Sequence, residues 1–153
     1  MKTPVKLIVG LAVTTVVLVA ADPILGTWKM NVSKSKINPG AAPQSVTAVY
    51  SQEGDWIVIK TNGIDSAGKP ISRTNRVKRD GAEYPYEGPY GKGTISVKRI
   101  DDYNSESVTK FSGGHAVNTR TVISKDGKTR TQTSRGTNAK GERVNSVAVF
   151  EKQ

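Results

Sequence analysis

Residues 116–135 read AVNTRTVISKDGKTRTQTSR, and this stretch decides the fold. Two runs rich in Val, Ile and Thr flank Lys125, Asp126 and Gly127. Residues branched at Cβ pack well on a pleated sheet and lose rotamer freedom in a helix. So short a connection joins antiparallel neighbours, because a parallel crossover needs about a dozen residues or more. The stretch therefore predicts a β-hairpin.

Similar runs, separated by short clusters of turn-forming residues, recur after residue 21. We expect strands at residues 26–32, 44–51, 55–61, 71–79, 94–100, 105–111, 116–124, 128–135 and 143–151. Leucine occurs only once in this part, at Leu25, and no helix of ordinary length is predicted. Strands joined as neighbours form an antiparallel up-and-down meander, and closure into a barrel of about 8–10 strands removes its exposed edges. We therefore expect residues 22–153 to form one all-β barrel domain.

Residues 1–21 have the pattern of a removable signal peptide. Lys2 and Lys6 precede an uncharged apolar run that ends in small residues, and Asp22 follows. A transmembrane anchor is the alternative, but a membrane-spanning helix needs about 20 apolar residues and this run is shorter. We expect cleavage, which predicts a periplasmic or extracellular protein without a stable membrane anchor.

Composition excludes several classes of function. The chain has no cysteine and a single histidine, His115, which argues against disulfides, thiolate chemistry and multi-histidine metal sites. The net charge is +10, but the basic residues are spread along the chain and do not alternate with aromatic residues that could stack bases. We expect no enzyme activity, no cofactor, no metal and no nucleic-acid partner.

The interior of the barrel is expected to be partly polar. Only 35% of the chain is hydrophobic and 6% aromatic, so little bulk is available to fill a core. The run 128–135 has no apolar face: its two faces read Thr129, Thr131, Thr133 and Arg130, Gln132, Ser134. Whichever face points inward brings groups that need hydrogen-bond partners or water.

Gly26-Thr27-Trp28 lies on the first expected strand, shortly after the signal segment. It resembles the G-x-W element of lipocalins and the wider calycin group, which implies a barrel closed at one end by Trp28 with a late basic residue packed across it. That basic residue would be Arg143 or, less well, Arg135.

A second resemblance covers nearly all of residues 22–153. The runs 22–36, 97–102, 122–128 and 149–153 are similar to a group of uncharacterised secreted bacterial lipocalin-like proteins, which implies no activity. Typical lipocalins have a helix after the barrel, and fatty-acid-binding relatives have a helical pair between the first two strands. Here only the Pro- and Gly-containing segment 33–43 occupies that position, and we expect it to cover one end of the barrel.

The expected function is to hold a small amphipathic or anionic ligand in the lumen. Arg99, Arg130 and Arg143 are the candidate anchors, because arginine offers a two-pronged donor to carboxylate or phosphate. Tyr86 and Tyr90 are the candidate residues near the mouth. For Arg99 an alternative stays open, in which it lies at the rim and pairs with Asp101 or Asp102.

The segment 82–92 (AEYPYEGPYGK) is the least generic part of the chain. It contains Tyr84, Tyr86 and Tyr90, and we interpret it as an aromatic loop. The loop is either a recognition surface, since tyrosine gives large contact area at low entropic cost, or a packed cap over the barrel end. The first possibility supports an alternative function, in which an envelope or extracellular interaction protein binds a protein or polysaccharide and no small ligand.

Overall fold

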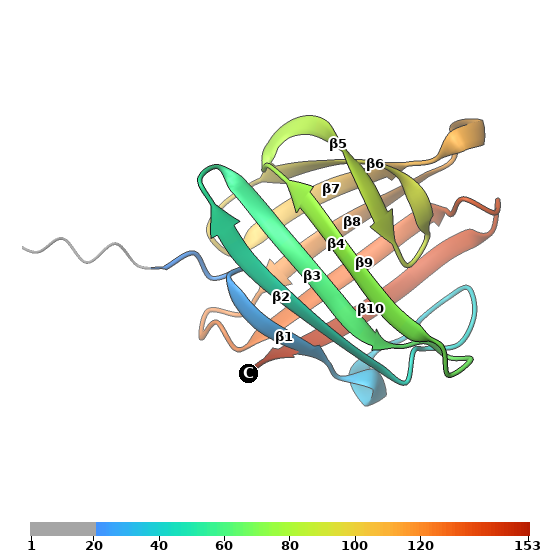
Figure 1. The fold of residues 1–153 in the computed structure, drawn as a ribbon, viewed down its shortest axis with the longest axis horizontal. Helices are drawn as coiled ribbons and strands as arrows, with labels where there is room; N and C mark the ends of the chain where they lie inside the picture. The colour runs from blue at the N-terminus through green and yellow to red at the C-terminus, as the bar shows by residue number, and fades with distance from the viewer. Residues whose placement is uncertain (1–20) are drawn as a thin grey trace, which may run out of the picture.

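The computed structural model describes residues 21–153, so the predicted signal peptide lies outside the described residues except for Ala21. Ten antiparallel strands form one sheet that curves into a nearly closed barrel (Figure 1). The expected all-β fold class is confirmed. Within the described residues, no helix is long and apolar enough to cross a membrane.

The strands follow one another with short connections. They are β1 (Gly26–Met30), β2 (Ser45–Glu53), β3 (Trp56–Ile64), β4 (Pro70–Val77), β5 (Asp80–Gly88), β6 (Gly91–Arg99), β7 (Asn104–Lys110), β8 (Ala116–Ile123), β9 (Thr129–Thr137) and β10 (Arg143–Lys152). The only helical elements between residues 21 and 153 are two single 3-10 turns, η1 (Val32–Lys34) and η2 (Ser112–Gly114). No helical pair therefore separates β1 from β2, as the sequence predicts.

Nine of the ten strands correspond to predicted ones, and β5 is the exception. The segment interpreted as an aromatic loop is a hairpin of β5 and β6, in which Tyr84 pairs with Ile95 and Tyr86 with Gly93. Pro85 lies within β5, in the segment interpreted as a loop. The proline is tolerated because β5 is an edge strand, so one of its sides carries no backbone ladder.

The barrel has one seam, between β4 and β5. These strands are consecutive in the chain, yet they lie at opposite ends of the hydrogen-bonded order β4-β3-β2-β1-β10-β9-β8-β7-β6-β5. The side chain of Asn75 on β4 bridges them: its Nδ2 donates to the carbonyl oxygen of Glu87, and the Glu87 amide donates to its Oδ1, both at 2.9 Å. One side-chain amide thus takes the place of a backbone ladder at this point.

Trp28 closes one end of the barrel, as the G-x-W element implies. Its side chain is fully buried, and its Nε1 donates to the carbonyl oxygen of Ile24 at 2.8 Å. The segment before β1 is thereby held against the barrel end, where Lys152 also donates to the carbonyl oxygen of Pro23 at 3.1 Å. The buried residues Met30, Ile123 and Phe150 join Ile24 and Trp28 in one apolar cluster.

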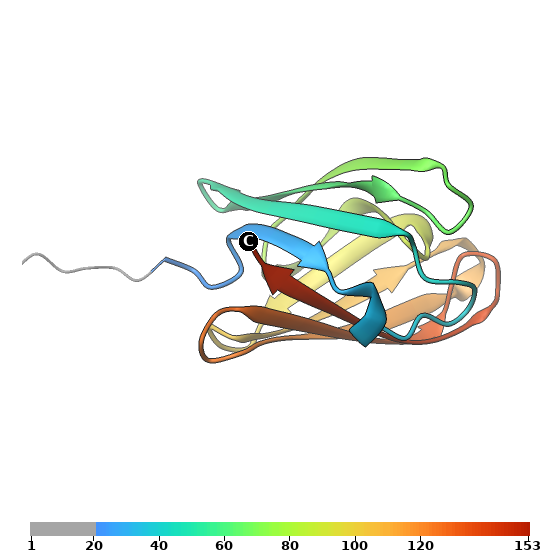
Figure 2. The same ribbon diagram turned by 90° about the horizontal axis from the view of Figure 1, so that it is seen from below.

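The remaining core is divided rather than continuous. A second cluster of Ile57, Val77 and Ile95 lies along β3, β4 and β6, and a third of Phe111, Val117 and Val144 lies at the end opposite Trp28. Figure 2 shows β2 to β4 on one side of the interior and β8 to β10 on the other.

Candidate functional site

Arg130 on β9 points into the barrel, and its charged side chain is fully buried. It pairs with Phe150 on β10 and Ile123 on β8, and its exposed fraction is 1%. Its Nε and Nη1 have no hydrogen-bond partner. Buried polar groups are almost always paired, so two donor nitrogens without partners on a buried cation call for an explanation.

Aromatic rings surround this guanidinium group. Its central carbon lies 4.3 Å from the ring centroid of Phe150, 4.6 Å from that of Tyr50 and 5.3 Å from that of Trp28. The negative faces of such rings attract a cation, which offsets part of its desolvation. They do not accept the N–H hydrogen bonds as a carboxylate would. The guanidinium group is therefore held in place but still lacks acceptors.

Arg73 and Tyr86 bring further polar groups to the same interior. Arg73 on β4 pairs with Thr61, which in turn pairs with buried Ala48, so Arg73 shares the inward face. Burial raises the pKa of Tyr86 to about 12, while the charges of Arg73 and Arg130 act in the opposite direction. Tyr86 therefore keeps its proton at neutral pH and can donate a hydrogen bond.

No carboxylate balances these arginines from the barrel wall. The register places the six acidic residues of the strands on the outward face; they are Glu53, Asp80, Glu83, Glu87, Glu106 and Glu151. Neither Arg73 nor Arg130 takes part in an ion pair among residues 21–153. The interior thus has a positive charge that a bound anion could neutralise.

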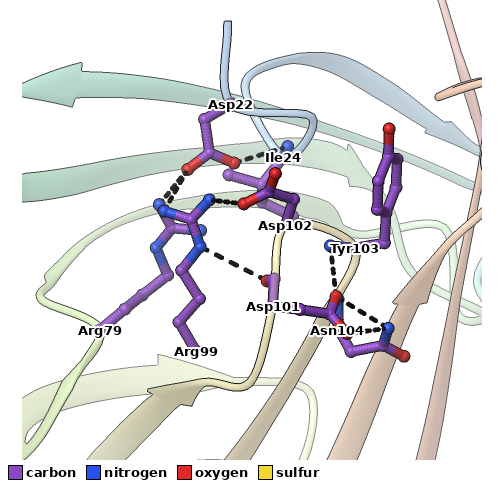
Figure 3. Close-up of polar contacts among 8 residues, drawn as sticks. All are labelled: Asp22, Ile24, Arg79, Arg99, Asp101, Asp102, Tyr103 and Asn104. Atoms are coloured by element: carbon purple, nitrogen blue, oxygen red, sulfur yellow. Dashed lines mark hydrogen bonds and ion pairs between the residues drawn. The ribbon is translucent and has the colours of Figure 1, made fainter. Parts of the chain in front are cut away.

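Arg99 is not an interior anchor, because its charge is compensated at the rim. Its Nη2 lies 2.5 Å from Oδ1 of Asp102, and its Nη1 lies 3.6 Å from Oδ2 of Asp22 (Figure 3). Arg79 also forms an ion pair with Asp22. Burial alone would raise the pKa of Asp22, but hydrogen bonds from Arg79 and from the Ile24 amide, with the charges of both arginines, lower it below 3.8. The rim alternative for Arg99 is the observed arrangement.

Arg143 also lies elsewhere than expected, whereas Tyr90 lies at a barrel end, as predicted. Arg143 is exposed on the outward face of β10, because its neighbour Val144 points inward. It borders an open external groove of about 480 Å³ and cannot act as an interior anchor. Tyr90 occupies the β5–β6 turn and packs against the cluster containing Phe111, which makes it a cap at that end.

The basic residue packed across Trp28 is neither Arg143 nor Arg135. It is Arg130, together with Lys152, whose Nζ lies 5.1 Å from the indole centroid. Lys152 pairs directly with Trp28 across β1 and β10. That expectation was wrong because the pairing of the last strand with the first cannot be derived from local patterns.

The segment 82–92 is only in part a free aromatic surface. Tyr86 packs into the interior beside Ile57 and Val77. Tyr84 is half-buried: its ring packs against the same cluster and against Trp56, and its hydroxyl donates to Asp80 in an exposed hydrogen bond of 2.8 Å. Sequence reasoning also missed Tyr50 and Arg73 as interior polar residues. The signal was present, because Arg73 is two residues from Ile71 and four from Val77 on one strand, and so shares their face.

Within residues 21–153, no group of three or more His, Cys, Asp or Glu side chains is placed so that it could hold a metal ion. Comparisons with family models and with curated proteins give no match. Comparison with solved structures does. The barrel is similar to a Schistosoma mansoni fatty acid binding protein in complex with arachidonic acid, with a TM-score of 0.60 and 14% identity over 86% of this chain and 96% of that one.

It is also similar to a zebrafish ileal bile acid-binding protein complexed with cholic acid, with a TM-score of 0.55 and 18% identity over 86% of this chain and 99% of that one. The fold is calycin-like. Identities this low establish the shared architecture alone. Any ligand of this calycin-like barrel has to be argued from its own side chains.

Proposed function

We propose that this protein binds a small amphipathic ligand with a negatively charged group inside the barrel. The observation that carries the proposal is the buried guanidinium group of Arg130, whose Nε and Nη1 have no acceptor. A carboxylate or similar anion would supply that acceptor through charge-assisted hydrogen bonds. Arg73 and the protonated hydroxyl of Tyr86 are the further groups that support an anion site.

The rest of such a ligand would lie against apolar side chains. Ile57, Val77 and Ile95 form a buried cluster beside Tyr86, and burial of an alkyl or ring system there contributes about 25 cal/mol per Å². Two structural neighbours are described as complexes with arachidonic acid and cholic acid, both acidic amphiphiles. We propose no catalytic activity, since the site holds cations and hydroxyls without a nucleophile and base in contact.

Calorimetry on delipidated protein tests this function, with oleate and oleyl alcohol as probes. We expect oleate to bind, and Arg130→Met to weaken oleate binding about 100-fold, since a hydrogen bond to a charged group contributes about 1.5–3 kcal/mol. Oleyl alcohol should bind both proteins alike. Arg135→Met, on the exposed face of the same strand, is the matched control. Equal oleate affinity in wild type and Arg130→Met would refute the proposal.

We also propose that the chain is exported and cleaved before Asp22, on the sequence pattern of residues 1–21. The arrangement of the barrel rim supports cleavage no later than this bond, because Asp22 pairs with Arg79 and Arg99. N-terminal sequencing of protein from a bacterial periplasmic fraction is expected to begin at Asp22. Recovery of the chain only as an uncleaved cytoplasmic form would contradict the proposal.

A further inference from the structure

The two sides of the interior differ in polarity. On β7, β8 and β9 nearly all inward side chains between the apolar ends carry a hydroxyl or amide. We call this set the polar wall: Ser105, Ser107, Thr109, Thr119, Thr121, Gln132 and Ser134. The opposite side, which we call the apolar wall, is formed mainly by Val46, Tyr50, Ile57, Ile59, Ile71 and Val77 on β2 to β4, where Thr61, Arg73 and Asn75 are the polar side chains that also face inward. Figures 1 and 2 show these two groups of strands on opposite sides of the barrel.

The polar wall is not sealed by packing. Ser107, Thr119 and Gln132 face inward from the middle of the sheet, yet they are only half-buried. Inward side chains that stay accessible are not fully covered by the opposite wall. In the ligand-free protein, water hydrates those of their hydroxyl and amide groups that have no protein partner.

Hydrogen bonds within the polar wall leave much of its capacity unused. Thr119 and Ser134 share one hydrogen bond at 2.9 Å, and Gln132 donates a long one of 3.4 Å to Thr121. A hydroxyl group can donate one hydrogen bond and accept two, so these residues can bind further partners. Those partners are water in the empty barrel and ligand atoms in the occupied one.

This asymmetry discriminates between ligands. An alkyl chain that fills the interior displaces water from the polar wall without replacing its hydrogen bonds, which is unfavourable. A ligand with hydroxyl groups along one side replaces those bonds and still presents an apolar side to the apolar wall. Sites built to hydrogen-bond a ligand hydroxyl discriminate strongly against the analogue that lacks it.

We infer that the ligand is an anionic amphiphile hydroxylated along one side, with its hydroxyl groups on the polar wall and its charge at Arg130. The inference rests on the proposed function, because it assumes an anion in the interior. It adds the specificity-determining residues Thr119 and Ser134, which hold each other in place at the centre of the polar wall.

Calorimetry with stearate and 9,10-dihydroxystearate tests the inference, since the two probes differ only in two hydroxyl groups. We expect the dihydroxy acid to bind at least tenfold more tightly, because a net gain of about 1.4 kcal/mol corresponds to tenfold. Equal affinities, or tighter binding of stearate, would overturn the inference and leave the proposed function standing. Binding of neither acid would refute the proposed function, and the inference with it.

A pair of variants assigns any preference to the polar wall. Thr119→Val combined with Ser134→Ala keeps the side-chain volumes nearly unchanged, and we expect it to reduce the preference for dihydroxystearate to less than threefold. Thr133→Val on β9 is the matched control, because Thr133 pairs with Arg120 on the outward face. The control should keep the full preference. A preference that survives in the double variant would overturn the assignment of the ligand hydroxyls to this wall.

Discussion

Arg99 and Arg130 both occupy inward positions of barrel strands, but only the charge of Arg99 is paired with carboxylates. Arg99 lies at the rim, where Asp22 and Asp102 neutralise it. Arg130 lies inside among aromatic rings and has no carboxylate partner. A cationic side chain inside a barrel is therefore not by itself evidence of a binding site. What distinguishes the two is whether the protein supplies the counter-charge.

Solvent explains why the two arrangements occur where they do. The rim pair of Arg99 remains partly exposed, so its contribution to stability is modest. The interior guanidinium group is desolvated, which is costly unless an anion is present. A protein selected only for stability would gain by replacing Arg130 with an apolar residue. Retention of the charge therefore suits a site that is completed by a ligand.

The largest expected effect comes from removing Trp28, whose ring lies against Arg130 and whose indole Nε1 holds the segment that carries Asp22. Trp28→Ala should lower the free energy of unfolding by about 3–5 kcal/mol, because it empties a fully buried site and frees the carbonyl oxygen of Ile24. Urea denaturation measures the loss. Trp28→Phe keeps a ring beneath Arg130 and should lose less. A loss below about 1 kcal/mol in Trp28→Ala would show that this end does not hold the barrel together.

Arg130→Met tests the buried cation directly, because it removes the unpaired charge but keeps the packing volume. We expect the free energy of unfolding of the ligand-free protein to stay unchanged or to rise by about 1–2 kcal/mol. Urea denaturation of delipidated protein measures it. If stability instead falls by more than about 2 kcal/mol, the contacts with Trp28, Tyr50 and Phe150 outweigh the missing hydrogen bonds, and Arg130 is structural.

The ion pairs of Asp22 with Arg79 and Arg99 predict that the stability of the protein depends on pH. The pKa of Asp22 is lowered in the folded state, so its ion pairs stabilise the protein above the unfolded-state value near 3.8 and are lost as the pH falls through the folded value. Asp22→Asn should therefore lower stability by about 1 kcal/mol at pH 7. Its effect should shrink towards pH 3. Denaturation curves at both values check this, and a loss of equal size at both would contradict the role of the charge.

The strands of the barrel wall were predicted from the sequence better than the arrangement at the barrel's ends. Alternation in runs such as 116–124 and 143–151 is a local signal, and those strands are present. β5 was missed because Pro85 argues against a strand unless the strand is known to be an edge. Edge position is a property of the whole sheet, so no window of sequence contains it.

The candidate site shows the same limit. Arg130 was selected because its strand has no apolar face, which is a local observation, and it does lie in the interior. Arg143 failed because which face of the last strand points inward depends on its register with β1 and β9. Arg73 is a different case, because its alternation with Ile71 and Val77 is a local signal that was overlooked. Residues on strands paired with distant partners can be assigned to the interior only once that register is known.

The smallest expected effect comes from a change at the seam between β4 and β5. It allows the seam to be compared with strand pairs that have a full backbone ladder. Asn75→Ala removes both hydrogen bonds to Glu87, where other strand pairs have a continuous ladder. We expect a loss of less than about 1 kcal/mol in global stability, because neighbouring contacts persist.

Amide exchange of β5 should accelerate severalfold while that of β9 is unchanged, since local opening at an edge needs less free energy than global unfolding. Asn62→Ala, at an exposed position of β3, is the control and should leave exchange unaltered. Equal acceleration in β5 and β9 would mean that Asn75 stabilises the whole barrel and not the seam.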